Sequence, residues 1–229
     1  MASPKIVSQE AAPDRSLVRG RDTKALILDA AEALFSVHGY DAVSMRNITS
    51  RAGVRLALAT YHFSTKESLF ESIIARRAEV LNERRLVALG AILDRGAPTV
   101  AQILTSFIKP YLDLRVSRDV GWRNYSLLIA QLAQINRWLP LVDKYFNPTA
   151  HRFHEALCAA LPELPKPVVS RCFVFAIQLM VSELAGNERI DTLSQGALSG
   201  NDVKQVYLDL IPFLVGGFEA IARREAASG

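Results

Sequence analysis

The sequence predicts an all-α fold, with an N-terminal three-helix helix-turn-helix domain followed by a larger helical domain. Apolar residues recur at three- and four-residue steps along most of the 229 residues, and no stretch shows the alternation of a half-buried strand. Half of the residues are hydrophobic and 22% are charged, which is the composition of a soluble globular protein with a sizeable core. We expect an arm over residues 1–21, a helix-turn-helix domain over 22–66 and the larger domain over 67–229.

The N-terminal arm contains two prolines, a glycine and mixed polar residues, so we expect it to be disordered. Its three arginines leave two alternatives open: a solvated tail, or an arm that lies along phosphates or in the minor groove of a nucleic acid. The first helix is expected to begin at Asp22 or Thr23 and to end at Gly39 in a left-handed cap. Its apolar stripe comprises Ala25, Leu28, Ala31, Leu34 and Phe35.

The stretch around which the chain is organised begins at Ser44, a good N-cap for a second helix. Gly53 can turn the chain through left-handed backbone angles without steric cost. A third short helix is expected from Arg55 to Tyr61. Two short helices joined by a tight glycine-containing turn form a helix-turn-helix, whose second helix fits the major groove of DNA. The pattern therefore predicts DNA binding.

The larger domain is predicted to be helical throughout. Its first helix has a possible cap at Ser64 or Thr65, and Pro110 and Pro148 fall inside later helices, which they should kink. The expected helices are Lys66–Leu93, Thr99–Val116, Trp122–Asn136, Pro140–Leu161, Lys166–Asn187 and Asp202–Arg224.

The smaller domain also resembles a known family. The stretch LILDAAEALFSVHGYDAVS, followed by MRNIT, RAGV, YHF and STKESLF, resembles the N-terminal DNA-binding domain of the TetR family of bacterial repressors. Two positions depart from the family pattern. Thr49 stands where Ala is usual, and Thr60 stands where many members have a Tyr, so that the aromatic residue here is the next one, Tyr61. The resemblance implies a homodimeric transcriptional repressor that binds a palindromic operator on double-stranded DNA.

Candidate DNA contacts divide by chemistry, because phosphate contacts supply affinity whereas base-edge contacts supply specificity. Arg46 can reach a guanine edge through its bidentate fork, and it matches a family position that contacts a base. Lys66 begins a helix whose dipole also favours an anion, and its family counterpart holds the DNA backbone. The base candidates are Arg46, Arg55, Leu56 and Ala57, with a phosphate as the alternative for Arg46 and Arg55. The phosphate candidates are Ser44, Thr60, Tyr61, His62 and Lys66.

The distribution of charge agrees with a polyanionic partner for the smaller domain. Residues 1–66 carry nine Lys/Arg and six Asp/Glu, a net charge of +3, whereas residues 67–229 carry eighteen and seventeen, a net charge of +1. A solvated basic surface is the alternative.

The last two predicted helices are too apolar for one copy of the chain to cover. The stretch from Val168 to Ala185 is apolar on nearly every face, and the final helix carries an apolar stripe beside Gly216-Gly217. Two copies can cover both helices in a four-helix bundle, which is the dimer interface that the resemblance implies; a self-contained core is the alternative. The expected interface residues are Phe173, Val181, Leu184, Phe213, Gly217 and Phe218.

Much of the larger domain is similar to the regulatory domain of fatty-acid-responsive TetR proteins, in the order RNYSLLIAQL, KYFNPTAHRFHEALCAALPELP and VYLDLIPFLVGGFEAI. We expect a small apolar effector that releases the protein from DNA. A fatty acid or acyl thioester is favoured, and an aromatic or drug-like effector is the alternative. The expected pocket residues are Phe107, Tyr111, Trp122, Arg123, Leu127, Phe146, His151, Phe173 and Ile177. Arg123, Asn124, His151 and Arg152 are candidates to receive a carboxylate, and plain core packing is the alternative for the apolar residues.

No catalytic signature supports an enzyme, since the sequence contains no GxSxG, P-loop, GxGxxG or HExxH motif. His151 and His154 share a helix face but have no third metal ligand, so we expect neither a metal nor a cofactor. Cys158 and Cys172 are expected to be free thiols in a reducing cytoplasm. No apolar signal core or membrane-spanning run is evident, so we expect a cytoplasmic protein. The alternative of another class is a helical interaction or lipid-carrier protein that does not bind DNA.

Overall fold

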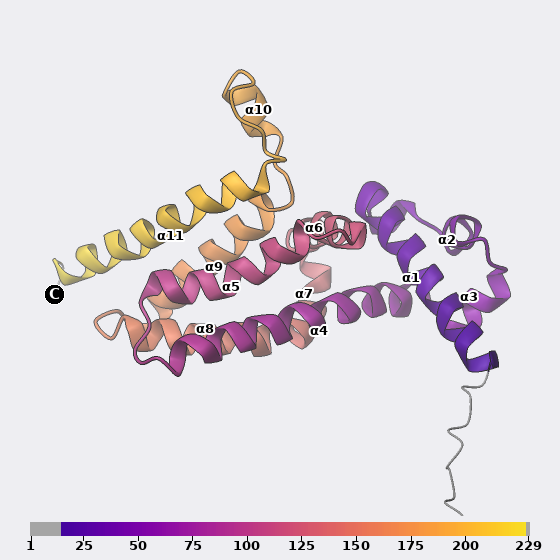
Figure 1. Ribbon diagram of the computed structural model, residues 1–229, viewed down its shortest axis with the longest axis horizontal. Coiled ribbons are helices and arrows are strands. Elements are labelled where there is room, and N and C mark those ends of the chain that lie inside the picture. Colours follow the sequence, from indigo (N-terminus) through magenta and orange to yellow (C-terminus); the bar gives the residue numbers. More distant parts are fainter. Residues whose placement is uncertain (1–14, 228–229) are drawn as a thin grey trace, which may run out of the picture.

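The computed structural model describes the backbone of residues 15–227 and the side chains from residue 22 onward. Every regular element in this part of the chain is a helix, which confirms the predicted fold class. Figure 1 shows α1, α2 and α3 forming a small head at one end of an elongated larger domain. The elements are α1 (Arg15–Ala42), α2 (Met45–Ala52), α3 (Leu56–His62), α4 (Lys66–Leu93), α5 (Val100–Arg115), α6 (Val120–Leu132), the 3-10 turn η1 (Asn136–Trp138), α7 (Leu139–Tyr145), α8 (Asn147–Ala160), α9 (Lys166–Glu183), α10 (Arg189–Leu193) and α11 (Val203–Ala226).

The first helix begins at Arg15, seven residues before the expected start. The expected start of this helix at Asp22 or Thr23 is therefore wrong, because Gly20 costs about 1 kcal/mol relative to Ala in a helix but does not end one. The rest of the arm, residues 1–14, lies outside the described residues. At the other end, Gly39 leaves the helical region with φ 76° and ψ 165°, and one further turn runs to Ala42.

The helix-turn-helix follows from local capping. The Ser44 side chain accepts a hydrogen bond from the Asn47 backbone N–H, and the Asn47 side chain accepts one from the Ser44 backbone, which closes a capping box on α2. Gly53 ends α2 at φ 66°, where a side chain would be strained. Thr65 forms a second capping box with Ser68 and starts α4. Ile27, Phe35, Val43, Ile48 and Phe63 are buried between the three helices of the head and the start of α4.

The larger domain follows the predicted helices, but α6 ends at Leu132 rather than Asn136 and α9 ends at Glu183 rather than Asn187, and two larger differences are present. The single helix expected over residues 140–161 is divided at Phe146 (φ −121°), because Pro148 cannot donate the backbone hydrogen bond that a continuous helix needs. The short helix α10 arises in a stretch that we expected to be a loop, and Figure 1 shows it projecting from the body. By contrast, Pro110 is accommodated inside a continuous α5.

The core of the larger domain is built around a cluster of aromatic rings. Phe107 of α5 packs edge-on against Phe153 of α8 and Phe173 of α9, with ring centroids 4.9 Å and 5.1 Å apart. This aromatic cluster joins the middle helices and leaves α11 on the outside, against α5 and α9.

Cys158 and Cys172 are both free thiols, and Cys172 is buried.

One described helix, α11, is long and apolar enough to cross a membrane on length and composition alone. This is weak evidence for a membrane span, because helices that pack against another protein have the same composition. Only four of its 24 residues are buried in the protomer, namely Val203, Leu210, Leu214 and Phe218.

Candidate nucleic-acid interface and effector cavity

The third helix presents almost its whole surface to solvent. Only Ala59 of its seven residues is buried, whereas the Tyr61 side chain is 83% exposed and Leu56 and Leu58 are more than 40% exposed. Arg55, at the N-cap of this helix, is also exposed. Leu58 was not among our predicted DNA contacts. Because only Ala59 of α3 is buried, both leucines of the helix are exposed to solvent.

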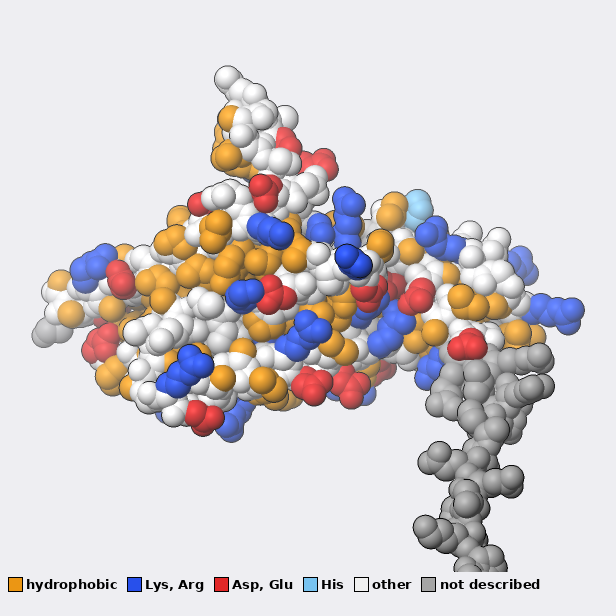
Figure 2. Space-filling model, viewed as in Figure 1, with side chains coloured by type: hydrophobic (Ala, Val, Ile, Leu, Met, Phe, Trp, Pro, Cys, Tyr) orange, Lys and Arg blue, Asp and Glu red, His pale blue; other side chains and the backbone are white. Residues whose placement is uncertain are grey.

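Three other predicted DNA contacts, Ala57, Thr60 and His62, also lie on α3, and Arg46 lies on α2. Arg46 and Ala57 are exposed, and the Thr60 hydroxyl donates a hydrogen bond to the Leu56 carbonyl (3.1 Å), which leaves its oxygen able to accept. The ring of His62 is half-buried and packs edge-on against Tyr61. From residue 42 to residue 66 the chain has four Lys/Arg and no Asp/Glu, so this end of the head is basic. Figure 2 shows Lys and Arg side chains projecting from the head.

Two of the predicted phosphate contacts also hold the head together. The hydroxyl of Ser44 is engaged in the cap of α2. The Lys66 ammonium is half-buried, donates hydrogen bonds to the carbonyls of Tyr40 and Val43 (both 3.0 Å), and lies 4.0 Å from the centre of the Tyr40 ring. Lys66 therefore fastens the end of α1 to the start of α4, so its side chain has a structural role in the protein without DNA.

A network of ion pairs ties the head to the larger domain. Glu32 of α1 is 1% exposed and accepts hydrogen bonds from Arg76 (3.0 Å) and Arg77 (2.9 and 3.0 Å) of α4. Burial raises the pKa of the Glu32 carboxyl, and the hydrogen bond and charge of Arg77 oppose that shift. Arg77 also pairs with Asp119 (2.5 Å), the N-cap of α6, and this hydrogen bond lowers the pKa of Asp119. One arginine thus joins α1, α4 and α6.

The far end of α6 makes a second contact with the head. The Gln131 side chain donates a hydrogen bond to the Ser36 carbonyl of α1 (2.9 Å). Just beyond α6, the Trp138 ring lies 4.9 Å from that of Tyr40 and 4.5 Å from that of Phe70, measured between centroids. Both ends of α6 are therefore attached to α1, and a movement of α6 would move the head.

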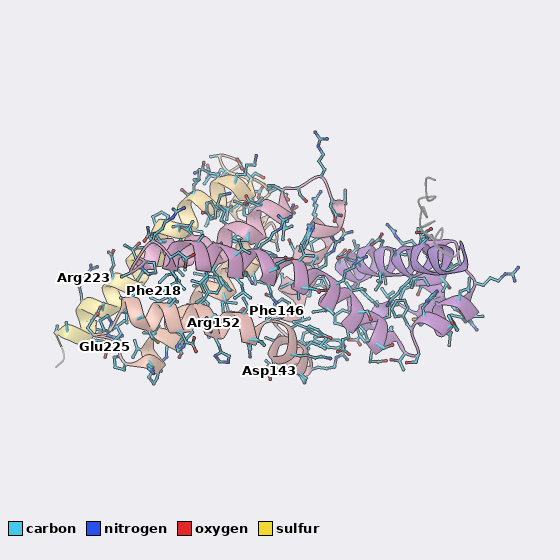
Figure 3. All side chains as sticks on the ribbon, turned by 60° about the horizontal axis from the view of Figure 1, so that its bottom comes forward. Asp143, Phe146, Arg152, Phe218, Arg223 and Glu225 are labelled. Atoms are coloured by element: carbon cyan, nitrogen blue, oxygen red, sulfur yellow. The ribbon has the colours of Figure 1, made fainter. Side chains whose placement is uncertain are left out.

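A cavity of about 220 Å³ lies among α4, α5, α6, α7, α8 and α9. Figure 3 shows Phe146, one of its wall residues, where α7 meets α8, nearer to the head than Arg152 and Phe218. The wall is mainly apolar. It comprises Leu81, Arg85, Phe107, Tyr111, Tyr125, Ile129, Leu132, Ala133, Ile135, Asn136, Leu139, Val142, Phe146, Asn147, Ala150, Val174, Ile177, Gln178, Met180 and Val181.

The cavity contains a buried charge that we did not predict. Arg85 of α4 is 4% exposed, and burial lowers its pKa to about 10, so it stays charged at neutral pH. Leu81 and Leu89, four residues away on either side, are buried, so the spacing placed Arg85 within the apolar stripe of the helix. This four-residue spacing is the signal in the sequence that could have identified Arg85 as a buried residue.

The structure separates the predicted pocket residues into two groups. Phe107, Tyr111, Phe146 and Ile177 lie together on the cavity wall. The remaining five do not line the cavity. Phe173 and Trp122 are buried in the core, Leu127 is half-buried, and Arg123 and His151 are exposed. His154, considered above for a metal, forms a hydrogen bond between its ring nitrogen Nε2 and Ser170 (2.8 Å). Among the described residues no group of three His, Cys, Asp or Glu side chains gathers.

The residues predicted for the dimer interface also fall into two groups, one buried and one exposed. The side chains of Phe173, Val181, Leu184 and Phe218 are buried within the protomer, because these faces of α9 and α11 pack inward, and their part in a dimer interface stays a prediction. Phe213 is 70% exposed and Gly217 is exposed. The exposed apolar side chains missed by the prediction are Val174, Phe175 and Leu208. Figure 2 shows hydrophobic side chains gathered over α11 and α5.

Two family models match the chain. The model described as bacterial regulatory proteins, tetR family, matches residues 27–73, and the model described as tetracyclin repressor-like, C-terminal domain, matches residues 105–217. The chain belongs to the tetR family of bacterial regulatory proteins. The two matches fall on the head and on the larger domain, so the predicted family holds for both.

Individual relatives are more distant. Over 98 residues the chain is 35% identical to the HTH-type transcriptional repressor KstR2 of Rhodococcus jostii, which covers 42% of this chain and 46% of that protein. It is 26% identical over 149 residues to the HTH-type transcriptional dual regulator CecR of Shigella flexneri, covering 63% of this chain and 61% of that protein. The chain thus covers less than two thirds of the length of either relative.

The fold is shared with solved structures. The fatty acid degradation regulator FadR from Bacillus halodurans superposes with a TM-score of 0.61, over 91% of this chain and 98% of that chain. The two sequences are 14% identical, so this likeness concerns the fold alone.

Proposed function

We propose that this TetR family protein is a DNA-binding transcriptional repressor, acts in the cytoplasm as a homodimer on a palindromic operator, and leaves DNA when a small apolar effector fills the cavity. The observation that carries the proposal is the outward surface of α3. A seven-residue helix with one buried residue gains little stability from packing. Its exposed surface carries three large side chains, Leu56, Leu58 and Tyr61. Apolar side chains suit the methyl groups of thymine, and the Tyr61 hydroxyl suits a phosphate.

Charge supports the same surface. Arg46 and Arg55 flank α3 in a segment without acidic residues, so a polyanion meets no repulsion there. Arg46 has the shape for a guanine edge, and Arg55 can reach a base or a phosphate. Lys66 and Ser44 would contact phosphates of the DNA backbone, in addition to making the hydrogen bonds within the head.

Dimerisation is supported by the exposed apolar side chains of α9 and α11. Leu208 and Phe213 are 60% and 70% exposed on α11, and Phe175 is 57% exposed on α9. Covering this surface with a second copy would remove apolar area from water, which stabilises an interface by roughly 25 cal/mol per Å². Two heads related by a two-fold axis would bind half-sites about one helical turn, or roughly 34 Å, apart.

Release follows from the elements that the cavity shares with the head. Tyr125, Ile129 and Leu132 on the inner face of α6 line the cavity, while Gln131 on another face holds α1. Likewise α4 carries Arg85 in the cavity wall and Arg77 in the ion-pair network. A ligand that displaces either helix therefore acts on the head through direct contacts, which is a coupling between two sites.

The test is fluorescence anisotropy of the purified protein with labelled DNA from the region flanking its own gene, at two salt concentrations. About eight neutralised phosphates would give a log–log salt slope near −7. Fatty acids of increasing chain length and their thioesters are then added to the complex, together with a neutral aromatic compound. We expect Tyr61→Ala to weaken DNA binding at least tenfold, and Val87→Ala, on the exposed side of α4, to leave it unchanged.

Two outcomes would contradict the proposal in different ways. Tight DNA binding that none of the compounds reverses would remove the release mechanism and keep the repressor. Binding of the apolar compounds by a protein with no affinity for any DNA would favour the alternative of a lipid carrier.

A further inference from the structure

The cavity holds a positive charge without a counter-charge. Buried charges in proteins are ordinarily paired, because removing an isolated ion from water is costly. Within the described residues the Arg85 guanidinium instead donates to the Phe107 carbonyl (2.9 Å) and to the sulfur of Met180 (3.4 Å), and lies 3.7 Å from the centre of the Phe107 ring. None of these partners carries a negative charge, and Arg85 is the one charged side chain that lines the cavity.

Two phenol hydroxyls in the same wall also lack partners. The side chains of Tyr111 and Tyr125 are almost completely buried, and in the described structure neither hydroxyl oxygen has a hydrogen-bond partner. The Ser126 hydroxyl lies close enough to Tyr111 to oppose the rise in its pKa, but it donates its own proton to the Trp122 carbonyl (2.8 Å). Burial raises the pKa of both phenols, so both hydroxyls are protonated donors at neutral pH.

We propose that the natural effector is an apolar monocarboxylate, whose carboxylate binds Arg85 and accepts hydrogen bonds from the Tyr111 and Tyr125 hydroxyls. A carboxylate offers two oxygens that accept about four hydrogen bonds, which matches a guanidinium and two phenols. The proposal rests on the cavity being the effector site of the proposed function. It replaces Arg123 and His151, both exposed, with buried residues as the carboxylate receptor.

Other occupants fit the charges less well. The protein supplies no internal carboxylate, because Glu32, the acidic residue whose field reaches Tyr125, is already bound by Arg76 and Arg77. A phosphate dianion would bring two charges to one guanidinium in an apolar wall. A cation would meet repulsion, and a neutral aromatic or drug-like compound would leave Arg85 unpaired.

The volume limits the apolar part of the ligand. At roughly 10–15 Å³ of this volume for each water-sized unit, 220 Å³ holds about 15–20 non-hydrogen atoms. This is enough for an aliphatic acid of medium length or an acid with a ring. The coenzyme A part of an acyl thioester does not fit, and a fully enclosed long-chain acid reaches the limit of this volume.

The test is isothermal titration of the full-length dimer, without DNA, with octanoate, octanol and palmitate. We expect octanoate to bind at least tenfold more tightly than octanol and more tightly than palmitate. Arg85→Met should weaken octanoate binding at least tenfold and leave octanol unchanged, since a hydrogen bond to a charged group contributes about 1.5–3 kcal/mol. Tyr111→Phe, which keeps the ring, should weaken octanoate binding severalfold. Arg84→Met, at the exposed position next to Arg85 on α4, is the matched control and should bind as the wild type does.

Equal affinity for octanoate and octanol, or octanoate binding that survives Arg85→Met, would overturn the carboxylate site. Tighter binding of palmitate would overturn the size limit. Because titration without DNA measures binding alone, octanoate that binds through Arg85 but does not release DNA would refute the release mechanism and leave this inference intact. DNA binding without binding of any acid would refute the inference and leave the repressor intact.

Discussion

Replacing Arg85 with methionine should make the protein without its effector more stable. Burial lowers the pKa of Arg85 to about 10, well below that of an ordinary arginine, and each pKa unit corresponds to about 1.36 kcal/mol, so keeping the charge costs on the order of 3 kcal/mol. The variant loses the hydrogen bond to the Phe107 carbonyl and the contact with the Phe107 ring, which contribute about 1 kcal/mol each. Methionine is apolar and flexible enough to fill the space, so we expect a net gain of about 1–2 kcal/mol.

The assay is urea unfolding of delipidated protein, at one protein concentration because dimerisation contributes to stability. Arg84→Met is the control and should stay within about 0.5 kcal/mol of the wild type. The folded-state pKa of Arg85 lies below its ordinary value, so the cost is fully present below pH 10 and falls gradually as the pH rises from 10 towards the ordinary pKa of arginine. The advantage of Arg85→Met should therefore shrink as the pH rises past 10. A loss of about 3 kcal/mol or more in Arg85→Met would refute the reasoning, because it would show that the charge has a buried partner.

Three other substitutions, two of them with a control variant, test the head and the interface. Gly53→Ala places a side chain at φ 66° and should lower the free energy of unfolding by about 1 kcal/mol or more. Its control is Gly90→Ala, in α4 with open space around it, which should raise the free energy of unfolding slightly. Thermal unfolding measures both. Arg46→Ala should weaken binding to the operator by about 1–3 kcal/mol and relax specificity at one base pair; equal losses at every sequence in anisotropy would instead indicate a phosphate contact. Phe213→Asp should yield monomers in sedimentation experiments, and a dimer as stable as that of Val87→Asp would place the interface elsewhere.

Local signals in the sequence were sufficient for α2 and for the start of α4. The caps at Ser44 and Thr65 and the turn at Gly53 act through neighbouring backbone groups, so their positions alone located α2 and the start of α4. The bounds predicted for α4, Lys66–Leu93, agree with the structure. The start of α1 was missed because Gly20 was given the weight of a helix breaker, although a single glycine inside a helix only lowers its stability.

Tertiary packing decided what the sequence left open. Phe173 and Phe213 both lie on apolar helices, but only packing determines that one ring points into the protomer and the other into solvent. Arg85 has an ordinary helix-forming side chain, and its burial depends on α5 and α9 closing over α4. Periodicity places a residue on a face of its helix, whereas the partner of that face is a property of the whole fold.

The central claim is that the basic, exposed surface around α3 reads DNA in a symmetric dimer. The most direct measurement is selection of bound duplexes from a random-sequence pool by the full-length protein, followed by sequencing. The account predicts enrichment of a palindrome with half-sites about one helical turn, roughly 34 Å, apart, and relaxed selection at one base pair of each half-site in Arg46→Ala. A pool that remains random after selection, or enrichment of single sites without a symmetric partner, would contradict it.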